Sequence, residues 1–135
     1  KKKSLNYIFK NADIVSLHIN LTEKNKKIIN NKLLNLCKKN CIIINTSRGE
    51  IIDEEFLIRQ IYNNKIRGYA TDVISQENNK HHLNKFLEKV KNLDNIIVTP
   101  HIGGFTKESL NYTEALIAEY FKDKIINDKS SITKV

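Results

Sequence analysis

The sequence is poor in the residues that build several common kinds of site. Its 135 residues contain only four glycines, at positions 49, 68, 103 and 104, so they lack the G-x-G-x-x-G turn that holds a dinucleotide pyrophosphate. There are two cysteines, Cys37 and Cys41, and their spacing is not C-x-x-C. We therefore expect two reduced core thiols rather than a redox or zinc site. His81 and His82 are adjacent and lack further ligands at a useful spacing, so no metal site is predicted.

Long apolar runs are absent as well. No stretch approaches the roughly 20 apolar residues that span a bilayer, and no signal peptide stands at the first residue, so we expect no membrane association and a cytoplasmic location. Positive charge dominates: 23 Lys and Arg against 15 Asp and Glu give a net charge of +8. The lysines are scattered, whereas specific nucleic-acid readers usually cluster Arg and aromatic side chains. We therefore predict no nucleic-acid partner.

What is present is an alternation of strand-like and helix-like segments. Short apolar runs end in Gly, Pro or polar residues, and the segments between them carry apolar residues at helical spacing. The alternation predicts an α/β fold, a partial Rossmann-like parallel sheet with flanking helices. The expected strands are 13–18, 41–44, 67–73 and 96–98; the expected helices are 4–10, one capped by Asn30 or Asn31, 53–63, 86–90 and 107–126, with a loop at 75–84.

The same patterns predict which residues are buried. The apolar runs 41–44 and 96–98 are typical of strands buried on both faces. The segment 107–126 is predicted to be an amphipathic helix with one apolar side. The residues expected along that side are Leu110, Ala115, Phe121 and either Ile117 or Ala118.

Three motifs carry chemically active side chains at strand ends. Arg48 closes the first apolar run, Glu77 follows the second by a few residues, and His101 lies in the third, which is broken by Pro and Gly. The carboxyl ends of parallel strands meet at one edge, where ligands bind in open α/β sheets. The sequence therefore predicts a cation, a carboxylate and an imidazole at that edge.

These three groups suit the oxidation of a secondary alcohol. Removing the hydroxyl proton needs a base that titrates near neutral pH, and His101 is the natural choice. Glu77, hydrogen-bonded to the far ring nitrogen, would fix the tautomer and stabilise the imidazolium. Arg48 offers a planar bidentate donor to a substrate carboxylate, which Lys would not replace well. The hydride must go to a bound cofactor, because no side chain accepts hydride.

The motifs resemble those of the D-isomer-specific 2-hydroxyacid dehydrogenases, most closely the phosphoglycerate dehydrogenase branch. The matching stretches are NTSRG at 45–49 with IIDE at 51–54, DV at 72–73 with Glu77, TPHIGG at 99–104 with Thr106, and ADIVSLH at 12–18 with Leu21 and Thr22. The resemblance implies an oxidoreductase that transfers a hydride between NAD and a D-2-hydroxy acid. A small 2-hydroxy or 2-oxo acid is the implied substrate, and 3-phosphoglycerate, in serine biosynthesis, is the specific expectation.

The resemblance also implies residue roles. Arg48, Glu77 and His101 are the implied catalytic residues. The residues implied to bind the cofactor are Ile19, Asn20, Thr46, Ser47, Arg48, Asp72, His101, Gly103 and Gly104. Family members commonly have Pro where Asn20 and Asn78 stand, so these two loops are expected to be less rigid here.

The expected domain organisation follows from what the resemblance leaves out. Residues 1–126 resemble the second half of a dinucleotide-binding domain, and 127–135 the start of the return segment toward a substrate-binding domain. We therefore expect a fragment of a larger NAD-dependent enzyme, inactive by itself, whose uncovered strand edge and helix-packing face favour a homo-oligomer. The residue that separates NAD from NADP is expected outside this sequence. The alternative is a non-catalytic binding or regulatory relative with the same fold.

Overall fold

The computed structural model describes residues 1–127, and the side chains of residues 1–122, in two compact units. The first unit is Lys1–His101, and the second begins at Ile102. All the strands of the described residues lie in the first unit, and the second contributes one long helix. No helix among the described residues is long and apolar enough to cross a membrane.

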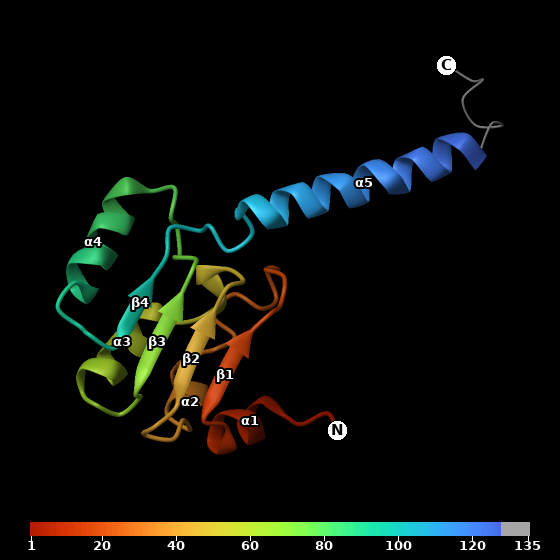
Figure 1. Ribbon diagram of the computed structural model, residues 1–135. Coiled ribbons are helices and arrows are strands. Elements are labelled where there is room, and N and C mark those ends of the chain that lie inside the picture. Colours follow the sequence, from red (N-terminus) through yellow and green to blue (C-terminus); the bar gives the residue numbers. More distant parts are fainter. Residues whose placement is uncertain (128–135) are drawn as a thin grey trace. The chain divides into compact units, whose positions relative to one another are not determined.

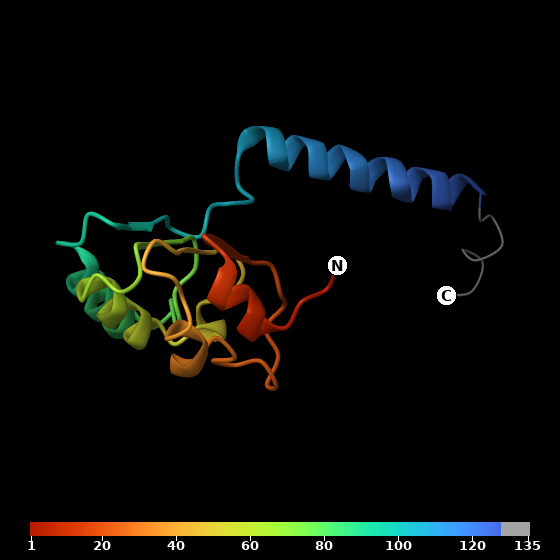
Figure 2. The same cartoon turned by 90° about the horizontal axis from the view of Figure 1, so that it is seen from below.

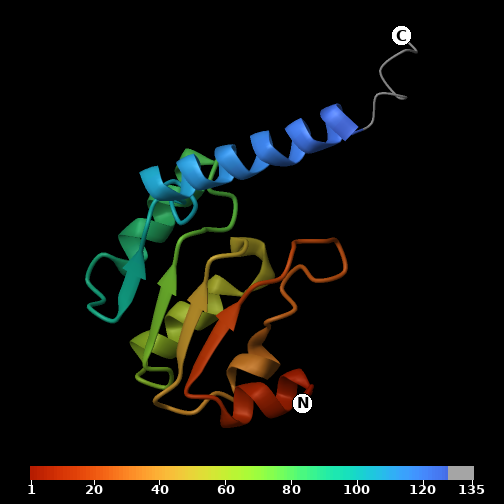
Figure 3. The same cartoon turned by 45° about the vertical axis from the view of Figure 1, so that its right-hand side comes forward.

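Four parallel strands form the sheet of the first unit. They are β1 (Ile14–Leu17), β2 (Ile42–Asn45), β3 (Gly68–Thr71) and β4 (Ile96–Val98), in the order β1-β2-β3-β4. Figure 1 shows the four arrowheads pointing the same way, and Figure 3 shows β1 and β4 at the two edges. A helix follows each of the first three strands before the next begins. The predicted partial Rossmann-like α/β sheet is confirmed.

Polar side chains define where the helices of this unit begin. The helices are α1 (Leu5–Asn11), α2 (Asn31–Leu34), α3 (Glu54–Tyr62) and α4 (Lys80–Val90), with a 3-10 turn η1 (Gly49–Ile51) before α3. Their N-caps accept hydrogen bonds from backbone N–H groups of the first turn; these caps are Ser4, Asn30, Asp53 and Asn79. The helices α2, α3 and α4 lie on one face of the sheet (Figures 1 and 2).

The start of α4 corrects the expectation of a loop over 75–84. The helix begins at Lys80 rather than near Phe86, because the Asn79 side chain accepts hydrogen bonds from the N–H groups of His81 and His82 at 3.1 and 3.2 Å. The polar run 80–85 therefore forms the first turns of a helix that buries Phe86. Polar composition concealed a capped helix there.

The core lies between the helices and one face of the sheet. Val15, Leu17 and Ile43 point into it and are almost completely buried. On the opposite face Ile14 and Ile97 are 60% and 63% exposed. A parallel sheet is usually covered on both faces, and within the first unit only one is covered.

This one-sided burial corrects a second expectation. Ile42 and Ile44 of β2, predicted to lie in a fully buried run, are only half-buried, and the residues of β4 are half-buried or exposed. Apolar composition indicated strands that are suited to burial on both faces. The second face has no helix over it within the first unit, so alternate residues remain accessible.

The second unit contains α5 (Lys107–Asn127), which confirms the predicted long helix. Its expected burial is wrong for the described residues, because apolar periodicity identifies the side of a helix that can pack but not a surface that packs on it. Leu110, Ile117 and Phe121 are 40%, 50% and 55% exposed, and Ala115 and Ala118 are exposed as well. Residues 128–135, with most of the expected return segment, lie outside the described residues.

Candidate active site

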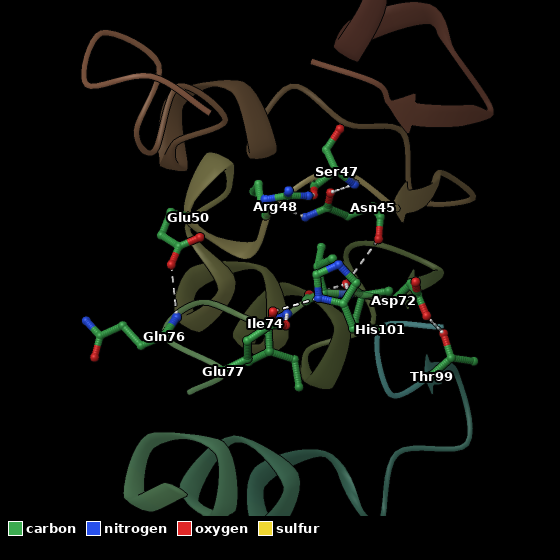
Figure 4. Close-up of polar contacts among 12 residues, drawn as sticks. Asn45, Ser47, Arg48, Glu50, Asp72, Ile74, Gln76, Glu77, Thr99 and His101 are labelled. Carbon is green, nitrogen blue, oxygen red and sulfur yellow. Dashed lines mark hydrogen bonds and ion pairs between the residues drawn. The ribbon is translucent and has the colours of Figure 1, made fainter. Parts of the chain in front are cut away.

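The carboxyl ends of three strands bring polar segments to one edge of the sheet. The parallel register pairs Asn45 with Thr71 and Thr71 with Val98. The segments that follow these residues therefore leave the sheet next to one another, at the edge where ligands bind in this class of fold. Figure 4 shows Arg48, Glu77 and His101 on these segments.

The turn that carries Arg48 is fixed by the buried side chain of Asn45. Its Nδ2 donates to the carbonyl oxygen of Arg48 at 3.0 Å, and its Oδ1 accepts from the N–H of Ser47 at 3.0 Å. Asn45 is fully buried, so both polar ends of its amide are used inside the turn. The Arg48 guanidinium is exposed, and its Nη1 donates to the carbonyl oxygen of Ser47 at 2.6 Å.

Ser47 connects this turn to the loop after β1. Its hydroxyl donates to the carbonyl oxygen of Leu17 at 3.0 Å and accepts from the N–H of Ile19 at 3.0 Å. The loop and the turn line a cavity of about 450 Å³. The cavity therefore brings together five of the predicted cofactor-binding residues: Ile19, Asn20, Thr46, Ser47 and Arg48.

The loop that contains Asn20 has its own restraints although it lacks the family's Pro. The Asn25 side chain donates to the carbonyl oxygen of Asn20 at 2.7 Å and accepts from the N–H of Thr22 at 2.7 Å. One amide thus bridges two backbone positions of the loop. Hydrogen bonding supplies some of the rigidity that a proline ring would supply through its fixed φ.

Glu77 and His101 form the closest ionisable pair at this edge. Oε1 of Glu77 lies 2.6 Å from Nδ1 of His101, and Oε2 accepts from the N–H of Ile74 at 3.4 Å. An ionised carboxylate only accepts hydrogen bonds, so this contact favours the tautomer with the proton on Nδ1, which leaves Nε2 without a proton. His101 adopts a φ of 55°, in the left-handed region that residues other than glycine rarely occupy.

Asp72 lies with this pair rather than with the first cavity. Its carboxylate is largely buried and accepts from the Thr99 hydroxyl at 2.5 Å. Asp72, Glu77 and His101 line a second cavity of about 460 Å³, whose apolar wall includes Leu83 and Leu87. The structure thus groups Asp72, predicted to bind the cofactor, with the predicted acid–base residues.

Gly103 and Gly104 belong to the second unit. A Cβ added at Gly104 would meet no atom of the described residues within 4 Å, so no close backbone approach requires a glycine there in this structure. Their role along the cofactor stays a prediction.

Residues that the sequence reasoning missed lie directly beside the predicted ones. Asn45 fixes the Arg48 turn, and Gly49, Glu50 and Glu54 contact the segment before Glu77. A glycine immediately after Arg48 was a signal of close backbone approach. Glu50 and Glu54 gave no such signal, because acidic residues are common near the N-terminus of a helix.

Both cysteines are free thiols. Cys41 is buried and Cys37 is half-buried. Hydrogen bonding with Cys41, and then burial, raise the pKa of the Cys37 thiol, which keeps it protonated and poorly nucleophilic. The side chains that the structure describes include no group of three or more His, Cys, Asp or Glu that could hold a metal ion.

The residues at this edge fit part of a dinucleotide. The cavity beside Ser47 is lined by residues of the loops that follow β1 and β2, at the carboxyl ends of two parallel strands, where dinucleotides bind in folds of this class. The glycine-rich turn that would hold the pyrophosphate is not in the sequence. A dinucleotide could therefore contact this edge with only part of its length.

Residues 1–103 match the family described as D-isomer specific 2-hydroxyacid dehydrogenase, NAD binding domain. The chain belongs to this family, whose members are NAD-dependent oxidoreductases of D-2-hydroxy acids. The family resemblance of the sequence motifs is thereby confirmed.

Individual relatives agree with this assignment. The chain is 38% identical over 118 residues to the D-3-phosphoglycerate dehydrogenase of Methanocaldococcus jannaschii, which covers 87% of this chain and 21% of the relative. It is 37% identical over 117 residues to an aromatic 2-oxoacid reductase of Clostridium sporogenes, which covers 81% and 35%. A solved D-isomer specific 2-hydroxyacid dehydrogenase from Lactobacillus delbrueckii ssp. bulgaricus, in an NAD complexed form, matches with a TM-score of 0.80 and 25% identity over 98% of this chain and 42% of that one. The chain thus spans less than half the length of each.

Proposed function

We propose that this chain is the catalytic part of an NAD-dependent dehydrogenase that interconverts a D-2-hydroxy acid and a 2-oxo acid. The observation that carries the proposal is the Glu77–His101 pair, joined at 2.6 Å at the sheet edge that also carries Arg48. A proton acceptor and a carboxylate-binding group are the two functions that this reaction requires of side chains.

Each of the three residues has a distinct role in the proposal. In the oxidation direction, Nε2 of His101 accepts the hydroxyl proton of the substrate. Glu77 holds Nδ1, orients the ring and stabilises the imidazolium that forms. Arg48 binds the substrate carboxylate and, in the reverse direction, polarises the adjacent carbonyl oxygen. Bound NAD would supply the hydride acceptor that no side chain supplies.

The cofactor-binding residues are proposed on the same basis. The cavity beside Ser47 suits the nicotinamide end of NAD, and hydrogen bonds of that serine to the β1 loop stabilise its shape. Asp72 and His101 border the neighbouring cavity. The proposed set is Ile19, Asn20, Thr46, Ser47, Arg48, Asp72, His101, Gly103 and Gly104.

We further propose 3-phosphoglycerate as the substrate. Support comes from the 38% identity to the M. jannaschii D-3-phosphoglycerate dehydrogenase, while the C. sporogenes aromatic 2-oxoacid reductase is similar at 37%. The test is kcat/KM of the full-length protein for 3-phosphoglycerate, D-lactate and an aromatic D-2-hydroxy acid. We expect a preference for 3-phosphoglycerate of about a hundredfold or more, because unpaired polar groups of a site reject analogues that lack the matching group.

The same assay separates this enzyme from a non-catalytic relative. NAD binding without NADH formation across the three acids would identify a binding or regulatory protein. A His101→Gln variant, which retains the cavity beside Ser47, shows whether any turnover belongs to this site. Turnover that survives this change unaltered would contradict the proposal.

The domain boundaries are proposed together with this function. Residues 1–126 form the second half of the dinucleotide-binding domain, and 127–135 begin the return toward a substrate domain. The 135-residue chain should then bind NAD with a Kd in the millimolar range or weaker, a loss of several kcal/mol in binding free energy relative to a typical micromolar site. It should also self-associate through its uncovered sheet. Calorimetry with NAD and light scattering check both expectations. Micromolar binding by a monomer would show a self-sufficient cofactor domain.

A cytoplasmic homo-oligomer is the proposed state of the whole protein.

A further inference from the structure

Two glutamates that follow the Arg48 turn in sequence reach across to the next strand's loop. Oε2 of Glu54 accepts from the backbone N–H of Ser75 at 3.1 Å, and Oε1 of Glu50 accepts from the backbone N–H of Gln76 at 3.0 Å. Figure 4 shows the second contact. We call these two hydrogen bonds the carboxyl clasp. They hold the two consecutive N–H groups that directly precede Glu77.

The clasp is possible because the two backbones touch. A Cβ added at Gly49 would lie 1.9 Å from the nitrogen of Ser75 and 2.2 Å from the carbonyl carbon of Ile74. No side chain fits into that space. Glycine lets the turn after β2 pack directly on the loop after β3, so that the side-chain oxygens of Glu50 and Glu54 reach its N–H groups.

The position of Glu77 depends on the loop that the clasp holds. Gln76 has a φ of 54°, a conformation that residues other than glycine adopt only when their surroundings impose it. Directly after it, Glu77 bonds with Oε2 to the N–H of Ile74 and with Oε1 to Nδ1 of His101. An unusual turn therefore sets the direction of the carboxylate that contacts the imidazole.

Glu54 occupies a costly position for a carboxyl group. Glu54 is only 6% exposed, and its Oε1 has no hydrogen-bond partner among the described residues. Burial raises the pKa of Glu54 to about 8; the charges of Glu50 and Glu77 act in the same direction, whereas the Ser75 N–H and Lys27 oppose them. A buried apolar side chain would avoid this penalty. Stability therefore does not explain why a carboxyl group stands at position 54 and bonds to the Ser75 N–H.

Favourable interaction with the helix N-terminus does not explain it. Acidic residues in the first turn of α3 are stabilising there, and Glu55 provides that charge on the exposed side, where it also pairs with Lys89 at 2.7 Å. This effect requires neither burial nor a bond to another loop. The contact between Glu54 and Ser75 is a separate feature.

We propose that Glu50 and Glu54 are positioning residues that fix Glu77 against His101 by holding the loop after β3 onto the Arg48 turn. This inference rests on the proposed function. The two glutamates bond to the backbone N–H groups of Ser75 and Gln76 and not to His101. Their effect on His101 therefore passes through Glu77. Together with the backbone contact at Gly49, the clasp fixes the position of Glu77 relative to Arg48.

The test uses four variants of the full-length protein. Glu50→Ala and Glu54→Ala each remove one bond of the clasp, Glu54→Gln keeps an oxygen acceptor for the Ser75 N–H, and Glu55→Ala is the matched control on the same helix turn. We expect kcat to fall about tenfold or more in both alanine variants of the clasp, with KM within about twofold, because small misplacement of a catalytic group lowers the rate steeply. Glu54→Gln and Glu55→Ala should stay within about twofold of the parent.

A second readout reports on the Glu77–His101 contact without turnover. The ring-nitrogen ¹⁵N shifts of His101, assigned with His101→Gln, measure the fraction of the tautomer protonated on Nδ1. This fraction should be high in the parent and in Glu55→Ala and should fall in Glu50→Ala. Glu50 is half-exposed, so this variant remains informative if Glu54→Ala does not fold.

The outcomes separate the clasp from the proposed function. Parent-like kcat and parent-like His101 shifts in Glu50→Ala would overturn the clasp. Loss of kcat with unchanged His101 shifts would overturn it too, since the effect would not pass through Glu77. If the parent shows no dehydrogenase turnover at all, the proposed function fails, and the tautomer measurement still decides whether the clasp positions Glu77.

Discussion

The two halves of the candidate site are stabilised in different ways. The Arg48 half is held from within, by the fully buried Asn45 and by Ser47. The half with Glu77 and His101 is partly exposed, with 34% and 43% of the two side chains accessible, and two glutamates from the other half hold the backbone before it. Changes in segment 49–54 should therefore reach Glu77, while changes at position 101 should leave the Arg48 turn intact.

Backbone conformation differs between the halves in the same sense. Arg48 is extended, whereas Gln76 and His101 have φ values of 54° and 55°. Such left-handed residues cost on the order of 1–3 kcal/mol each and persist only where other contacts enforce them. The reactive pair thus lies on the strained half, and the carboxylate-binding group on the relaxed half.

The largest effect is expected at His101. His101→Gln should lower kcat by about a thousandfold or more, about 4 kcal/mol, because no other group replaces the proton acceptor. Glu77→Gln should lower kcat less and keep partial activity, since the imidazole remains but loses the carboxylate that orients it and stabilises the imidazolium. Steady-state kcat/KM checks both variants. A parent-like kcat/KM for Glu77→Gln would contradict the pairing.

Arg48→Lys should have the next largest effect. Losing the bidentate geometry should cost about 2–4 kcal/mol in kcat/KM although the charge is kept. Thermal stability should not change, because Asn45 holds the turn through backbone atoms. Arg59→Lys, on the exposed side of α3, is the control and should leave kcat/KM unaltered. A loss of less than about threefold for Arg48→Lys rejects its assigned role.

Gly49→Ala tests the backbone contact between the halves. Its Cβ would overlap the Ser75 nitrogen, so we expect a loss of about 2–3 kcal/mol in the free energy of unfolding. Gly104→Ala is the matched control, because its Cβ would enter open space within the described residues. Urea unfolding of the two variants compares them. Equal stability of both would mean that the close contact is not present in solution.

Glu54→Gln should have the smallest effect on activity, and its main effect should be on how stability depends on pH. Burial raises the pKa of Glu54 from 4.5 to about 8, so between these values the folded protein keeps a proton that the unfolded chain releases. The contribution of Glu54 to the free energy of unfolding is fully present below about pH 4.5 and is lost as the pH rises toward 8. Replacing Glu54 by Gln should therefore remove a loss of stability of about 3 kcal/mol between pH 5 and 8. Urea unfolding at several pH values measures it, and Glu55→Gln, being exposed, should retain the parent slope.

The sequence predicted much of the fold because short-range signals specify it. Alternating apolar runs predicted the four strands, and Asn30, one of the two expected caps, is the N-cap of α2. The start of α4 was missed because the polar composition of the segment before Phe86 indicated a loop, although Asn79 caps a helix there. Burial was mispredicted in β2, β4 and α5, because the pattern of a segment shows what it can bury and not what covers it.

The sequence by itself determined that an arginine, a glutamate and a histidine follow strands of one parallel sheet, because strand periodicity and strand-end motifs are local properties. Only the tertiary structure decided that Nδ1 of His101 lies 2.6 Å from a carboxylate 24 residues away, and that Glu54 bonds to Ser75 across 21 residues. Those contacts depend on the register of β3 against its neighbours and on the backbone approach at Gly49. Both arise from packing between segments distant in sequence, which no single segment specifies.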